Sequence, residues 1–138
     1  MARRQGRRPA TPRREARTAR VGQSAVLYLR IDFGEQGALG PGKARLMELI
    51  GETGSISAAG RAMGMSYRRA WLLIDSLNAA FGAPLVAKQT GGSGGGGAVL
   101  TRLGRDVVAR YRRIERRAAT ASRKDIAALV AALAATAG

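Results

Sequence analysis

The sequence has 138 residues, and its 24 Lys and Arg against 9 Asp and Glu give a formal net charge of +15, which favours a polyanionic partner. It contains no cysteine and no histidine, so disulfides, thiolate metal sites and Ser-His catalysis are excluded, and we expect no enzyme, metal or cofactor. It has neither an apolar run long enough to span a bilayer nor a secretory h-region, which predicts a cytoplasmic, nucleoid-associated protein with no membrane contact.

The first 23 residues predict a disordered basic arm. Residues 1–20 hold eight arginines and one glutamate, a side-chain charge of +7, and contain no Leu, Ile, Val or aromatic residue. Such a segment cannot bury enough apolar surface to offset the entropy of ordering its backbone. The arm either contacts DNA, through phosphates or in a minor groove, or is only a solvated extension. The sequence leaves these alternatives open.

The predicted domain, residues 24–104, begins with a strand and a helix. Residues 26–33 alternate apolar and polar side chains, the period of two that is typical of a half-buried strand. A loop over 34–40 follows, and Pro41 suits the first turn of a helix because its missing N–H costs nothing there. Apolar residues between positions 44 and 50 give this helix one buried face, and two glycines are expected to close it.

The next stretch predicts two helices joined by a tight turn. Ser57 is the expected N-cap of a short helix over 58–63, and Gly64 ends that helix in the left-handed conformation. Ser66 caps a longer helix over 67–80. Its buried face is predicted from the spacing of Tyr67, Ala70, Trp71, Ile74, Leu77 and Phe81. A short helix, a glycine turn and a helix with a basic first turn form a helix-turn-helix.

A β-hairpin is predicted directly after these helices. Two short apolar runs flank the glycine-dense segment 91–97, which indicates a hairpin with a mobile tip. A hairpin that follows a recognition helix is a wing. A phosphate-binding Walker loop would need Lys followed by Ser or Thr after the last glycine, and Ala98 and Val99 stand there instead.

Residues 105–138 predict one or two C-terminal helices that mediate dimerisation. Thr101 is the expected N-cap, and the helix after it carries a narrow apolar stripe, which is typical of a two-stranded helical seam. Ser122 is expected to restart a helix in an alanine-rich segment. The alternative for the N-terminal half of the stripe is packing on the domain's own core. The predicted dimer contacts are Leu103, Val107, Tyr111, Ile114, Ile126, Leu129 and Leu133.

The helix-turn-helix and the wing share a specific pattern. It consists of Gly54–Ser57, Ser66-Tyr67, Ala70-Trp71, Ile74, Leu85-Val86, the segment TGGSGGGGAVLT at 90–101, and Gly104. This pattern resembles the DNA-binding domain of ModE-type molybdate-responsive transcription regulators, and its LT-x-x-G turn is similar to that of LysR-type regulators. The resemblance implies a mainly helical α+β fold, a winged helix-turn-helix with a three-helix core. It also implies a homodimer that binds double-stranded DNA.

The resemblance also places individual residues. Tyr67 and Arg68 stand at the start of the recognition helix, where the family has an aromatic and a basic residue. Leu72 and Leu73 are more apolar than the family pattern leads us to expect on the outer face. Full-length regulators of this type carry molybdate-binding domains that this sequence lacks, so we expect no molybdate sensing by this chain. A separate effector-binding protein is then a candidate partner.

The predicted DNA contacts combine base readers with phosphate binders. Arginine matches guanine O6 and N7 in the major groove, and Arg68 and Arg69 diverge by about 100° on a helix, so one is expected to read a base and the other to hold a phosphate. Free N–H groups at the starts of helices bind phosphate. The predicted contacts are Ser57, Ser66, Tyr67, Arg68, Arg69, Lys88, Thr90, Gly92, Ser93, Thr101 and Arg102.

Three functions fit these features. We favour a dimeric, sequence-specific transcription regulator, because only this function requires paired helices followed by a wing. The alternative is a nucleoid-type DNA- or RNA-binding protein without sequence preference, which needs charge alone. A third reading is an interaction module whose alanine-rich tail recruits a different protein.

Overall fold

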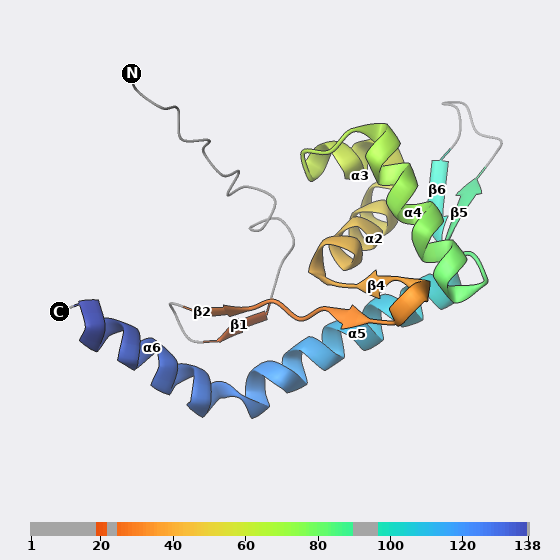
Figure 1. Cartoon of the computed structure of the whole chain (residues 1–138). Helices are drawn as coiled ribbons and strands as arrows, with labels where there is room; N and C mark the ends of the chain where they lie inside the picture. The colour runs from red at the N-terminus through yellow and green to blue at the C-terminus, as the bar shows by residue number, and fades with distance from the viewer. Residues whose placement is uncertain (1–18, 22–24, 90–96, 138) are drawn as a thin grey trace, which may run out of the picture.

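The computed structural model describes residues 19–21, 25–89 and 97–137 (Figure 1). Three helices follow one another in the middle of the chain: α2 (Pro41–Thr53), α3 (Ile56–Ala62) and α4 (Tyr67–Phe81). A two-stranded antiparallel hairpin, β5 (Val86–Gln89) and β6 (Gly97–Leu100), then lies beside α4. The predicted fold class, a mainly helical α+β winged helix-turn-helix, is confirmed.

Two further helices complete the chain. Helix α5 (Arg102–Ala121) runs from the base of the hairpin past α2, and α6 (Arg123–Ala137) leaves it at an angle (Figure 1). The break lies at Ser122, whose hydroxyl donates to the carbonyl oxygen of Ala118 at 2.6 Å. The predicted restart of a helix at this serine is confirmed. Within the described ranges, no helix is long and apolar enough to cross a membrane.

Local signals explain where most helices begin. Pro41 occupies the first turn of α2. The Ser66 hydroxyl oxygen accepts a hydrogen bond from the backbone N–H of Arg69 at 3.1 Å, and the Thr101 oxygen accepts one from Gly104 at 3.0 Å. These caps satisfy backbone donors that a helix leaves free at its start. Both predicted caps are therefore confirmed.

The predicted cap of α3 is wrong by two residues. Ser55, not Ser57, accepts the capping hydrogen bond, from the N–H of Ala58 at 3.0 Å. The chain enters this helix early because Ile56, only 6% exposed, packs into the core from its first helical position. Ser57 lies in the first turn, where its hydroxyl accepts a hydrogen bond from Arg61 at 3.1 Å.

The predicted continuous strand over 26–33 is in fact two short strands. β2 (Ala25–Leu27) pairs with β1 (Ala19–Val21), and β3 (Ile31–Asp32) pairs with β4 (Ala38–Leu39), each antiparallel. The chain departs from strand geometry between them, where the Leu29 carbonyl accepts a hydrogen bond from the hydroxyl of Tyr111 instead. Alternation of apolar and polar side chains indicates which side of a strand is buried, but it does not indicate which strand it pairs with or where the pairing stops.

Two other segments before α2 differ from expectation. The predicted loop over 34–40 contains a 3₁₀ turn, η1 (Gly34–Gln36), and strand β4. The predicted disordered arm overlaps β1 at residues 19–21, while residues 1–18 and 22–23 of that arm lie outside the described ranges.

The core lies between α2, α3, α4 and the first half of α5. Its fully buried large side chains are Leu46, Met47, Ile50, Ile74, Leu77, Leu85 and Tyr111. Helix α4 contributes Ala70, Ile74 and Leu77, as its spacing predicts. Tyr67 does not join them: it is 55% exposed, because it stands in the first turn of α4, beyond the edge of the core.

The buried face of α5 overlaps the predicted stripe at Val107 and Tyr111 and differs from it elsewhere. Its buried residues are Gly104, Val107, Val108, Tyr111, Glu115 and Ala119. The Tyr111 hydroxyl donates to the carbonyl of Leu29 at 2.6 Å and lies 3.2 Å from a Glu115 oxygen. Burial first, and then the Glu115 carboxylate, raise the pKa of this hydroxyl above its ordinary value. Arg112 joins Glu115, at 2.7 Å, to Glu48 of α2, at 3.0 Å.

Candidate nucleic-acid interface

The first turn of α4 presents two uncompensated cations. Arg68 and Arg69 are both exposed, and within the described ranges neither side chain forms an ion pair. The cap at Ser66 holds this turn in helical geometry, so both arginines project from a rigid base. A rigid helix that carries mobile guanidinium groups at its exposed start suits base and phosphate recognition.

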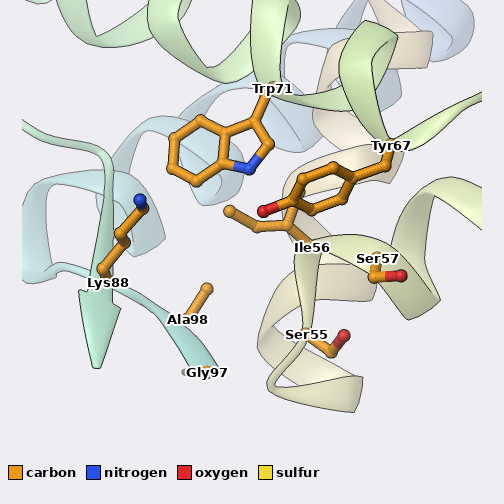
Figure 2. A pocket seen from close by; sticks show the side chains of 8 residues that line it. All are labelled: Ser55, Ile56, Ser57, Tyr67, Trp71, Lys88, Gly97 and Ala98. Atoms are coloured by element: carbon orange, nitrogen blue, oxygen red, sulfur yellow. The ribbon is translucent and has the colours of Figure 1, made fainter. Parts of the chain in front are cut away.

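A cleft separates α3 and the start of α4 from the wing. It encloses about 430 Å³ and is lined by Ser55, Ile56, Ser57, Tyr67, Trp71, Lys88, Gly97 and Ala98 (Figure 2). Aromatic side chains from α4 stand on one side and Lys88 of β5 on the other. The cleft therefore lies between the helices and the wing, with a lysine on the wing side.

Aromatic packing orders the cleft wall. The rings of Tyr67 and Trp71 meet edge to face, with centroids 6.3 Å apart. The ammonium nitrogen of Lys88 lies 4.6 Å from the centroid of the Trp71 ring, a cation–π distance. Trp71 thus has two roles, since its inner edge packs against the core and its ring orients Lys88. The spacing of α4 alone predicts only the first.

Backbone attachments fix the position of the wing. The N–H of Ala98 donates to the carbonyl of Gly54 at 2.9 Å, which ties β6 to the turn between α2 and α3. The Asn78 side-chain oxygen accepts from the N–H of Leu85 at 2.8 Å, which ties the start of the wing to α4. Asn78 is absent from the predicted site. The sequence feature that could have identified it is a polar amide side chain next to the buried stripe of α4.

Thr101 supports the wing through its side-chain hydroxyl. This hydroxyl donates to the carbonyl of Pro84 at 2.7 Å while it accepts from the N–H of Gly104. The hydroxyl thus helps to position the wing, and the predicted phosphate contact by this side chain stays a prediction. Arg102, the next residue, remains exposed at the first turn of α5.

The structure brings together only part of the predicted DNA contacts. Ser57, Tyr67 and Lys88 line the cleft. Ser66, Arg68 and Arg69 lie beside it, at the start of α4. The predicted wing contacts Thr90, Gly92 and Ser93 lie outside the described residues.

The predicted dimer contacts divide into buried and exposed residues. Val107 and Tyr111 are 8% and 1% exposed within their own chain, because the first half of α5 packs on the domain core. For these two residues the structure therefore agrees with the alternative, packing on the domain's own core. The remaining large apolar side chains stay accessible: Leu103, Ile114, Leu129 and Leu133 are 36%, 42%, 66% and 70% exposed, and Ile126 is half-buried.

The described residues hold no group of three His, Cys, Asp or Glu side chains placed to bind a metal ion. The charged side chain that lines the cleft, Lys88, and the two arginines beside it are all cations. These cations suit the recognition of an anion.

Residues 43–105 match the family described as bacterial regulatory helix-turn-helix protein, lysR family. The chain is 46% identical over 77 residues to the molybdenum-pterin-binding protein MopB of Rhodobacter capsulatus, covering 56% of this chain and 28% of that protein. It is 44% identical over 91 residues to the molybdenum transport protein ModE of Azotobacter vinelandii, covering 66% and 33%. For the DNA-binding transcriptional dual regulator ModE of Escherichia coli K12, identity is 42% over 71 residues, covering 51% and 27%.

The matched part of the chain thus spans about a third or less of the length of these relatives. Among solved structures, the chain is similar to the DNA-binding domain of CbnR in a crystal structure of its complex with DNA. That similarity has a TM-score of 0.49 at 23% identity and covers 63% of this chain and 94% of the CbnR chain.

Proposed function

We propose that the protein is a transcription regulator that binds specific double-stranded DNA sequences as a dimer. The similarity of residues 43–105 to the helix-turn-helix of LysR-type regulators, and of the chain to ModE proteins, supports this proposal. The observation that carries this proposal is the exposed basic first turn of α4 beside a cleft that ends at the wing. Charge alone would not require this order of elements.

In the proposed complex, α4 enters the major groove with its N-terminal turn first. The groove is about 12 Å wide and admits an α-helix. Arg68 then faces base edges and reads a guanine, while Arg69 and the capped start of the helix hold the adjacent phosphates. The core contacts of Ala70 and Ile74 keep the helix at a fixed depth.

The cleft receives the sugar-phosphate backbone. Lys88 supplies positive charge, and stacking on Trp71 limits its rotamer freedom before DNA binds. The hydroxyls of Tyr67 and Ser57 line the same cleft and are able to donate hydrogen bonds to phosphate oxygens. These contacts position the recognition helix and carry no sequence information themselves.

The exposed apolar side chains of α6 form the proposed dimer contact. Leu129 and Leu133 are two-thirds exposed, on a helix with little of its own domain to pack against. Burial of these side chains by a second copy removes apolar surface from water. Two-fold symmetry then predicts a palindromic site whose half-sites lie one helical turn or a multiple of it apart.

Selection of bound sequences from randomised duplex DNA tests the proposal. The full chain is incubated with the library at physiological salt, with and without sodium molybdate, because two relatives carry names that refer to molybdenum. An enriched palindrome supports a dimeric, sequence-specific regulator. Tight, salt-sensitive binding with no enriched sequence would instead support a general nucleic-acid coat.

A further inference from the structure

Leu72 is an apolar side chain with no place in the core. It is 58% exposed in the middle of α4, although its neighbour Leu73 packs against the core and Ile74 is fully buried. Helix α4 already completes its buried face with Ala70, Ile74 and Leu77. Folding of the domain therefore does not account for a leucine at this position.

Leu72 stands on the face of α4 that carries Arg68. Residues four apart lie one above the other on a helix, so Leu72 follows Arg68 by one turn. Asp75 and Ser76, in the next turn, are exposed as well. A helix that enters the major groove by its first turn therefore brings Leu72 to the base edges next to the pair that Arg68 contacts.

The surroundings of Leu72 do not form an apolar docking patch. Its exposed neighbours on α4 are the guanidinium groups of Arg68 and Arg69 and the carboxylate of Asp75. A protein partner that covered Leu72 would have to desolvate these charges for a single leucine side chain. A nucleic-acid partner would neutralise the two arginines at the same time.

We propose that Leu72 reads the C5-methyl group of a thymine, next to the guanine that Arg68 reads. This assignment rests on the proposed function, since it requires α4 in the major groove. Thymine alone presents a methyl group there, whereas the other bases present polar edges that a leucine would desolvate without offering a partner. Leu72 thus favours one base pair by contact and disfavours the others by desolvation.

Deoxyuridine isolates the methyl group, because it differs from thymidine only by the absence of that group. In the selected operator, each thymine is replaced in turn, symmetrically in both half-sites, and the dissociation constant is measured for the full chain. The proposal predicts at least one position where the replacement weakens binding by about fourfold per half-site, the value of one buried methylene-sized group.

Two variants test whether Leu72 is the reader. Leu72→Ala is expected to bind the thymine and uracil operators equally, and Leu72→Met is expected to retain the thymine preference. Val26→Ala, which shortens an exposed apolar side chain on β2, is the control and should keep the full thymine-to-uracil ratio. Thermal unfolding of Leu72→Ala should match the original chain, since the side chain is exposed.

The outcomes separate this inference from the proposed function. An enriched operator with no sensitivity to uracil at any thymine, or an unchanged ratio in Leu72→Ala, overturns the role of Leu72 and leaves the regulator intact. Failure to enrich any operator overturns the proposed function and the role of Leu72 with it.

Discussion

A Cβ atom on Gly104 would overlap the carbonyl oxygen of Leu85 and lie 3.0 Å from its carbonyl carbon, so the first turn of α5 and the base of the wing meet backbone to backbone. The N–H of Thr101 donates to the same carbonyl oxygen at 2.9 Å. This close approach explains the glycine of the LT-x-x-G turn, because a larger residue would push α5 away from the wing.

Gly104→Ala is therefore expected to destabilise the domain. Overpacking a close backbone contact typically costs about 1–3 kcal/mol, and here the neighbouring atoms belong to the backbone and cannot rotate away. Gly42→Ala is the matched control, since a Cβ in this position of α2 meets nothing within 4 Å. Urea unfolding of the two variants should show a loss for Gly104→Ala and no loss for Gly42→Ala. Equal stability would contradict the role assigned to Gly104.

The network of Arg112 predicts a second loss of stability. Arg112→Met removes the guanidinium that joins Glu48 to Glu115, whose exposure is only 2%. A buried carboxylate without its cation costs about 3 kcal/mol. Arg110→Met breaks the exposed pair with Asp106, with side chains 69% and 51% exposed, and should cost less than about 1 kcal/mol. Similar midpoints of denaturation for the two variants would argue against a buried network.

Substitution of Arg68 and substitution of Arg69 are expected to impair DNA binding in different ways. Arg68→Ala should relax preference at one base pair of the selected site, at a cost of about 1–3 kcal/mol for that site. Arg69→Ala should weaken binding to selected and scrambled duplexes by a similar factor and reduce the salt slope by about 1. Fluorescence anisotropy on both duplexes over a salt series measures both effects. A uniform loss in both variants would contradict base reading by Arg68.

Removal of residues 1–18 tests whether the basic arm binds DNA. This segment holds seven arginines and one glutamate and ends before β1. If the arm binds phosphates, its deletion should weaken binding to every sequence, and the salt slope should fall by about 0.9 for each phosphate that the arm neutralises. The ratio between selected and scrambled sites should remain. An unchanged salt slope would show that the arm is only a solvated extension.

Leu129→Asp tests the dimer contact on α6. Leu129 is 66% exposed in the single chain, so a charge there is harmless to the monomer and costly within an apolar interface. Sedimentation at micromolar concentration should show a dimer for the original chain and a monomer for the variant. Leu72→Ala, whose change lies on α4, should remain dimeric. A monomeric original chain would refute the proposed assembly.

The parts of the fold that the sequence predicts correctly depend on neighbouring residues. The start of α2 at Pro41, the caps at Ser66 and Thr101 and the break at Ser122 each follow from residues within one turn. The wing strands follow from two apolar runs that flank glycines. Such signals are local because they satisfy backbone groups of the same turn.

The parts that the sequence predicts wrongly depend on distant contacts. Two serines two residues apart are equivalent caps until the burial of Ile56 selects Ser55. On α5, Glu115 is buried and the predicted Ile114 is exposed. The buried carboxylate is held by Arg112, which also binds Glu48, 64 residues away on α2. Asn78 likewise acquires its role only when the wing folds back onto α4.

In the proposed complex α4 recognises a sequence, and not merely a polyanion. The ratio of dissociation constants for the selected palindrome and a scrambled duplex of equal length, measured at physiological salt, tests this recognition. Specific regulators bind their sites about 10³-fold or more tightly than other DNA, and we predict a ratio of at least that order. Equal dissociation constants would contradict sequence recognition by α4 and identify the protein as a general nucleic-acid coat.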